Sequence, residues 1–152
     1  MTTVVNGLAE LRALAGRDLD PSPWHEITQE QIDLFAQATG DHQWIHVDPE
    51  RAADGPFGGT IAHGYLTLSL LIPLWTDLLT IEGVEVKVNY GLNRVRLPAP
   101  VPAGAKVRLV AHVAAVDDIG ETGVQTTVDF TMELEGSAKP AVVAQAVYRY
   151  YL

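Results

Sequence analysis

One long apolar segment constrains the fold of this chain more than any other feature. Residues 63–80 read HGYLTLSLLIPLWTDLLT, so a helix built from them would be apolar on nearly every side. Such a helix is stable in water only when other elements cover it. A membrane span is the rival interpretation, but Pro73, Asp77 and the lack of basic flanks argue against it. We therefore expect a buried helix that Pro73 ends or kinks, and no membrane span.

The residues after this helix predict an antiparallel sheet. Apolar and polar residues alternate with a period of two, and Gly-containing turns at residues 117–120 and 136–137 separate the segments. Strands are predicted at residues 84–90, 106–115, 124–135 and 141–151. Only the apolar helix can cover the apolar face of such a sheet, so the sheet should curl around that helix. The sequence thus predicts an α+β fold.

The N-terminal part predicts shorter elements. Asn6 is a possible cap for a helix over residues 7–15, and residues 24–27 read as a short strand. Thr28 and Gln31 form a capping box that opens another helix, and Gly40 ends it in the left-handed conformation. With 152 residues, we expect one domain over residues 1–152, of which residues 1–20 form an N-terminal helical extension.

Composition excludes several classes of function. Hydrophobic residues make up 47% of the chain, which argues against disorder, and the absence of cysteine removes disulfides and thiolate chemistry. The net charge of −9 argues against a nucleic-acid partner, because such proteins need a basic face. The N-terminus has no signal-peptide pattern, so we expect a cytoplasmic protein.

An acid and a base lie close together just after Gly40. Asp41 precedes His46 by five residues, a spacing that does not share one stripe of a helix. The helix stop at Gly40 is therefore needed for the two side chains to converge, as proton-transfer chemistry requires. On local sequence alone, a turn aspartate and a half-buried histidine explain the two residues equally well.

The same segment also invites a metal interpretation. His42 and His46 have i, i+4 spacing beside Asp41. A first-row metal would require a third protein ligand and a helix to hold the pair, and Gly40 argues against a helix at this point. We therefore expect no metal site.

A buried helix wrapped by an antiparallel sheet is the hot-dog fold, and the motifs resemble the MaoC-like dehydratases, which include the R-specific enoyl-CoA hydratases. The family pattern runs Gly-Asp-x-Asn-Pro-x-His-x-Asp and continues later with a His-Gly pair that starts the central helix. Here it reads Gly40-Asp-His-Gln-Trp-Ile-His-Val-Asp48, followed by His63-Gly64. Gln43 stands where the family usually has Asn, and Trp44 where it usually has Pro. The resemblance extends from about residue 24 to the end.

The resemblance implies a mechanism. Asp41 and His46 hold the water that attacks the enoyl thioester, with Asp41 as the proton acceptor and His46 as its water-orienting partner. The backbone amide of Gly64 is expected to bind the thioester oxygen. A serine near the active site of the family matches Ser69, although a serine bonding to its own helix is at least as good an explanation. Gln43 and His63 complete the expected substrate-binding set, His63 by holding the loop before the helix.

The resemblance also implies partners. We expect a homodimer with an acyl-CoA substrate and no separate cofactor, because coenzyme A is part of the substrate. Basic residues cluster in one region of the sequence and are the candidates for binding the phosphates of coenzyme A: Arg94, Arg96, Lys106 and Arg108. Solvated strand ends explain their spacing equally well.

Three alternatives remain open at this point. The substrate of a dehydratase could be carried by an acyl-carrier protein instead of coenzyme A. A hot-dog thioesterase would need a carboxylate on the central helix, where Asp77 lies far from Gly64. A non-catalytic subunit that binds acyl thioesters is the third, and the departures at Gln43 and Trp44 keep it open.

Overall fold

The computed structural model describes all 152 residues, which form seven strands and six helices. In chain order these are β1 (Thr3–Asn6), α1 (Gly7–Arg12), β2 (His25–Glu26), α2 (Gln29–Thr39), α3 (Trp44–Val47), α4 (Pro49–Ala53), α5 (Gly64–Ser69), α6 (Leu71–Leu78), β3 (Leu79–Glu82), β4 (Val86–Arg96), β5 (Lys106–Ile119), β6 (Gly123–Leu134) and β7 (Val142–Tyr151).

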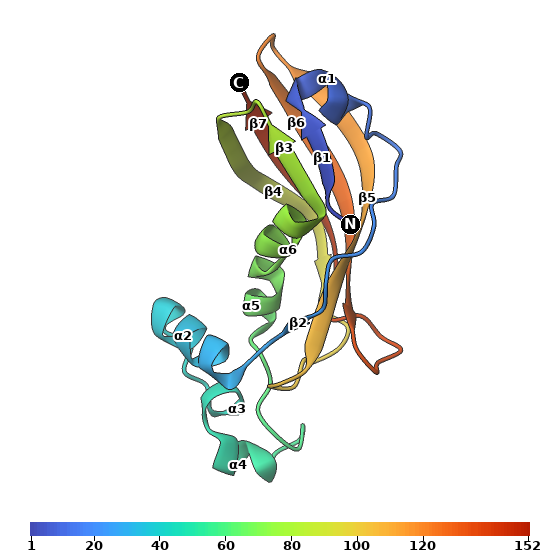
Figure 1. Ribbon diagram of the computed structural model, residues 1–152. Helices are drawn as coiled ribbons and strands as arrows, with labels where there is room; N and C mark the ends of the chain where they lie inside the picture. The colour runs from blue at the N-terminus through green and yellow to red at the C-terminus, as the bar shows by residue number, and fades with distance from the viewer.

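The main sheet has five antiparallel strands in the order β2-β5-β6-β7-β4. It curls along one side of α5 and α6, which lie end to end beside it (Figure 1). Helices α2, α3 and α4 project from one end of the molecule, and α1 lies at the opposite end (Figure 1). The α+β class and the hot-dog fold predicted from the sequence are confirmed.

The alternating pattern produces the core where the sequence predicted it. Val107 and Leu109 of β5 and Val128, Phe130 and Met132 of β6 are all at most 1% exposed. Strand β5 continues through Ile119, so the turn begins three residues later than expected, and a bulge between Val113 and Ala115 shifts its register. The bulge adds one residue to β5, which bends the strand and lets the sheet curl.

The central helix breaks earlier than predicted. Helix α5 ends at Ser69 and α6 begins at Leu71, so the break lies three residues before Pro73. The proline ring clashes with the carbonyl of the residue four positions earlier, which is Ser69, and this moves the disruption into the preceding turn. The second helix also ends at Leu78, because Leu79 already has extended dihedral angles and starts β3.

Strand β4 departs from its predicted pattern. The valines and the tyrosine expected on a buried face are exposed: Val86 is 48%, Val88 38% and Tyr90 57% exposed. β4 is the last strand of the sheet and pairs only with β7, so one of its edges is free. The alternation of apolar and polar residues is present in the sequence, but no element of the chain covers the apolar side chains of β4.

The N-terminal extension contains a strand as well as a helix. Strand β1 pairs in parallel with β3, from Thr3 opposite Leu79 to Asn6 opposite Glu82. Helix α1 ends at Arg12, short of the expected residue 15, and Asn6 makes no side-chain capping bond. The alternation of β1 spans four residues, too few to be recognised beside a helix. None of the helices combines the length and the apolar character that crossing a lipid bilayer requires.

Candidate active site

The loop that carries Asp41 begins where α2 stops. The Thr28 hydroxyl accepts the Gln31 N–H at 3.1 Å, which is one half of the predicted capping box. The Gln31 side chain bonds to His25 at 3.2 Å and does not return to the Thr28 N–H. Gly40 has φ of 83°, and its N–H donates to the Ala36 carbonyl at 2.8 Å. The left-handed backbone conformation costs little free energy only for glycine, so Gly40 can turn the chain out of the helix. Asp41 follows directly and has an exposed side chain.

His46 lies in the short helix α3 and is 7% exposed. Its Nδ1 lies 2.7 Å from the carbonyl oxygen of Ile61. A carbonyl oxygen only accepts, so Nδ1 carries the hydrogen and donates it. In the neutral ring this leaves the lone pair of Nε2 free, and Nε2 can accept a hydrogen bond or a proton.

The backbone of His46 is held by residues that the sequence analysis missed. Gln29 Nε2 donates to the His46 carbonyl at 2.7 Å, and the Thr60 hydroxyl donates to Gln29 Oε1. Gln29 is the first residue of α2, and Thr60 lies in the glycine-rich turn. The sequence carries no signal for these contacts, because they join segments that only the fold brings together.

His63 joins the Asp41 loop to the central helix. It is the N-cap residue of α5, is 2% exposed, and its Nε2 donates to the Asp41 carbonyl at 2.9 Å. Its ring stacks on His46 with centroids 4.0 Å apart and contacts Phe35 at 4.9 Å. Since Nε2 carries the hydrogen, Nδ1 of the neutral ring is an acceptor, and it is buried without a partner. The sequence predicted that His63 holds the loop before the central helix, whereas this hydrogen bond goes to Asp41 in the loop after α2.

Asp41, His46 and His63 each offer one polar atom, and these atoms all lie within 4.8 Å of one another. The stacking of the two rings, with 26° between their planes, fits a metal ion poorly. An imidazole binds a metal along a lone pair that lies in the ring plane. Because the rings lie one above the other, an ion in the plane of one would lie outside the plane of the other.

A cavity of about 230 Å³ brings His46 and Gly64 together. Gly64 is the first residue of α5, so its N–H has no acceptor within the helix. A Cβ at this position would lie 2.5 Å from Cδ1 of Leu97, which also lines the cavity. The absence of a side chain therefore makes room for Leu97, and Gly64 lines the cavity with backbone atoms alone.

Gln43 and Ser69 do not line this cavity. Gln43 is exposed at the N-terminus of α3, and its backbone N–H lies 3.4 Å from Oδ1 of Asp41. The hydroxyl of Ser69 donates to the Tyr65 carbonyl of its own helix at 2.7 Å, and Ser69 lines a different cavity. Asp77, the carboxylate that a thioesterase would need, lies at a third place beside Met1, Thr2 and Pro21.

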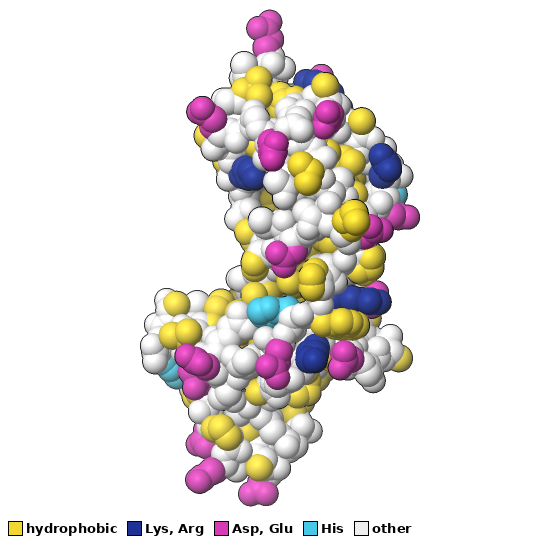
Figure 2. Space-filling model, viewed as in Figure 1, with side chains coloured by type: hydrophobic (Ala, Val, Ile, Leu, Met, Phe, Trp, Pro, Cys, Tyr) yellow, Lys and Arg dark blue, Asp and Glu magenta, His cyan; other side chains and the backbone are white.

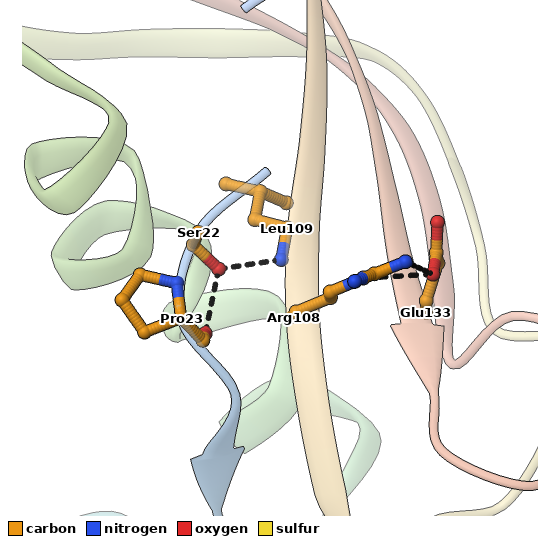
Figure 3. Close-up of polar contacts among 5 residues, drawn as sticks. All are labelled: Ser22, Pro23, Arg108, Leu109 and Glu133. Atoms are coloured by element: carbon orange, nitrogen blue, oxygen red, sulfur yellow. Dashed lines mark hydrogen bonds and ion pairs between the residues drawn. The ribbon is translucent and has the colours of Figure 1, made fainter. Parts of the chain in front are cut away.

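The four basic residues named from the sequence lie on two strands. Arg94 and Arg96 belong to β4, while Lys106 and Arg108 belong to β5, and β6 and β7 lie between these strands. Arg108 pairs with Glu133 at 2.9 Å (Figure 3). Its guanidinium also lies 4.7 Å from the Trp24 ring centroid. Figure 2 shows basic side chains spread over one face of the molecule, with acidic ones between them.

Comparison with known proteins identifies the family. The MaoC like domain matches residues 10–133. The chain is 57% identical to 3-hydroxyacyl-thioester dehydratase Z of Mycobacterium tuberculosis over 94% of this chain and 95% of that protein. It is 45% identical to nodulation protein N of Rhizobium leguminosarum bv. viciae over 90% of this chain and 86% of that protein. The solved structure of an (R)-hydratase from A. caviae superposes with a TM-score of 0.71 at 24% identity, covering 88% of this chain and 94% of that one. The chain therefore belongs to the MaoC-like dehydratase family and is an enzyme of the hydro-lyase class.

Proposed function

We propose that the protein is an R-specific enoyl-CoA hydratase, which adds water reversibly to trans-2-enoyl-CoA and gives (R)-3-hydroxyacyl-CoA. One observation carries this proposal. A single cavity is lined by His46 and by the N-terminal residue of α5, Gly64, and the Asp41 side chain lies within 4.8 Å of His46. Water activation and carbonyl polarisation, which the reaction requires together with protonation of C2, thus have suitable groups at one place.

Asp41 and His46 activate the water in this proposal. The free Nε2 of His46 accepts one hydrogen bond from the water, which orients it, and the Asp41 carboxylate accepts the other. As the water oxygen bonds to C3 of the substrate, Asp41 takes its proton. The pair then returns one proton to C2, so one water molecule is added across the double bond.

Gly64 binds the thioester oxygen in this proposal. Negative charge develops on that oxygen as water attacks C3, and an unpaired backbone N–H directed at it stabilises the charge. His63 keeps Asp41 beside the helix terminus, Gln43 is the amide nearest to Asp41 along the chain, and Ser69 lies further along the acyl chain. No additional cofactor takes part.

The phosphates of coenzyme A require cations at the surface. Arg94 and Arg96 lie on the edge strand β4, while Lys106 and Arg108 lie near the opposite edge of the sheet. Arg108 already has a carboxylate partner in Glu133. We favour Arg94 and Arg96, because they are two neighbouring cations on one strand without carboxylate partners, whereas Lys106 lies beside the already paired Arg108. Their replacement should raise KM with little change in kcat.

A homodimer formed through β4 is part of the same proposal. The strand is 11 residues long and has a free edge with exposed apolar side chains, and natural proteins avoid leaving such edges uncovered. Val88→Lys should give a monomer in light scattering. A wild-type monomer at micromolar concentration would contradict a dimer.

The decisive experiment follows the enoyl-thioester absorbance of crotonyl-CoA, with chiral analysis of the product. Rapid loss of absorbance with formation of the R-3-hydroxyacyl product is the expected result. No loss with crotonyl-CoA, but turnover of the same chain on an acyl-carrier protein, would reassign the carrier. No turnover with either would contradict a hydratase function.

A further inference from the structure

A larger cavity, of about 410 Å³, lies beside the central helix and contains none of the residues that line the cavity at His46. Its walls come from α5, α6 and β4, and its floor from β7. This is the size of a small-molecule site. Of the residues that line this cavity, only Ser69 already has a place in the proposed function, beside the acyl chain.

Polar groups without partners line part of this cavity. Tyr148 is 5% exposed and its hydroxyl makes no hydrogen bond, whereas the neighbouring Tyr150 hydroxyl accepts the Trp75 indole N–H at 3.0 Å. Asn89 lies directly beside Tyr148, as its cross-strand partner on β4, and its exposed side chain makes no hydrogen bond within the chain, while the Ser69 oxygen keeps its acceptor capacity. Carboxylates, lysine, arginine and histidine are all absent from the lining.

This lining selects for a particular chemical class. Six of the nine lining residues are hydrophobic, so the cavity suits an apolar chain. An entirely apolar chain would, however, bury the Tyr148 hydroxyl without a partner, which is costly. A charged group would find no counter-ion in the lining. The fitting ligand is therefore an uncharged apolar chain that carries one oxygen.

The distance of the cavity from Gly64 indicates that the ligand's apolar chain is the acyl chain of the thioester substrate. Ser69 lies five residues after Gly64 on α5, which corresponds to about 7.5 Å along the helix axis. An acyl chain whose thioester lies at Gly64 spans that length with six or seven carbons. The far end of such a chain then reaches Ser69, Asn89 and Tyr148.

We propose that this cavity binds the distal part of the acyl chain, and that Tyr148 together with Asn89 selects chains bearing a hydroxyl or keto oxygen about seven carbons from the thioester. This proposal rests on the hydratase function and names its substrate class. The Tyr148 hydroxyl donates to the substrate oxygen, and the Asn89 amide supplies the second hydrogen bond. Tyr148 is a specificity residue, because it contacts the chain far from the reacting carbons.

A matched pair of substrates tests this proposal. Trans-2-octenoyl-CoA and its 7-hydroxy derivative are compared with wild type, Tyr148→Phe, and the control Tyr151→Phe, whose ring lies against Gly123 outside the cavity. We expect wild type and Tyr151→Phe to prefer the hydroxylated substrate by about tenfold in kcat/KM. Tyr148→Phe should lose this preference and keep its activity on the plain chain. Equal kcat/KM values in wild type, or an unchanged preference in Tyr148→Phe, would overturn the proposal.

A second measurement separates this proposal from the hydratase function itself. Calorimetric dissociation constants for the two thioesters are measured with Asp41→Asn, alone and combined with Asn89→Ala. Tighter binding of the hydroxylated chain that Asn89→Ala abolishes supports the cavity, even if no thioester is turned over. Equal dissociation constants for the two thioesters contradict the proposal for this cavity. Equal turnover of the two thioesters by wild type, in the first experiment, also contradicts it but leaves the hydratase function intact.

Discussion

The two ends of the central helix are built in different ways. At the start of α5, the histidines His46 and His63 are buried and bonded to backbone carbonyls of Ile61 and Asp41. Toward the end of α6, Trp75 packs edge-on against Phe130 at 5.2 Å and stacks with Tyr148 at 6.2 Å. The first end is organised by directional hydrogen bonds, and the second by aromatic packing against the sheet.

The two ends of the central helix therefore have different roles, the first in the chemistry and the second in the stability of the fold. Hydrogen bonds at the start of α5 fix the tautomer and the direction of groups that can act on a substrate. The aromatic cluster contributes buried apolar area, and its polar atoms are few. Changes at the first end should therefore alter turnover with small effects on unfolding, and changes at the second end should alter unfolding first.

Asp41→Asn should give the largest loss at the polar end. Asparagine keeps the size of the side chain but cannot take up a proton at neutral pH, so turnover of crotonyl-CoA should fall by about a hundredfold or more. The melting temperature should stay close to that of wild type, because Asp41 is exposed. Near-normal turnover in this variant would mean that another group is the proton acceptor.

His63→Phe should give the next largest effect. Phenylalanine keeps a ring beside His46 but loses the hydrogen bond to the Asp41 carbonyl, so kcat should fall by about tenfold with little change in KM. His63→Gln retains an N–H donor and should recover part of this loss.

The control for this pair is His112→Phe, because His112 pairs with Asp18 away from the site. If His63→Gln and His63→Phe are equally impaired, the hydrogen bond is not the reason for the effect, and ring packing is the better explanation.

The aromatic end should respond to alkaline pH. Burial raises the pKa of Tyr150 to about 12, and burial, followed by the charge of Tyr150, raises the pKa of Tyr148. Tyrosine in an unfolded chain ionises near pH 10, so between pH 10 and 12 the unfolded state loses protons that the folded state retains. The free energy of unfolding should therefore fall by about 1.4 kcal/mol per pH unit for each of the two tyrosines.

Tyr148→Phe should remove about half of this alkaline loss, because one of the two buried phenols is gone. The measurement is urea unfolding from pH 9 to 11.5, with Tyr90→Phe as the exposed control. Identical pH slopes in wild type and Tyr148→Phe would show that burial of Tyr148 does not oppose its ionisation.

Ser69→Ala should give the smallest effect, because Ser69 lies between the two ends and bonds to its own helix. With straight-chain substrates, kcat/KM should change by about threefold or less. A complete loss of turnover would mean that Ser69 takes part in the chemistry, and the comparison between the two ends would then need revision.

The sequence predicted the elements whose signals are local. The capping box at Thr28, the left-handed stop at Gly40 and the alternation of β5 and β6 all depend on residues close together in the chain. The break at Leu70 was misplaced, because a proline disturbs the turn before it. Strand β1 was missed, because its partner β3 is more than 70 residues away.

The candidate site divides in the same way. The sequence by itself determined that an acid and a base follow a helix stop, and that a histidine and a glycine begin a buried helix. Only the tertiary structure decided that Ile61 fixes the tautomer of His46, that His63 holds Asp41, and that Tyr148 lines a cavity without a hydrogen bond to its hydroxyl. A sequence encodes which groups are present and their local conformation. Which of them share one space depends on how the sheet closes on the helix, since that packing joins residues far apart in the chain.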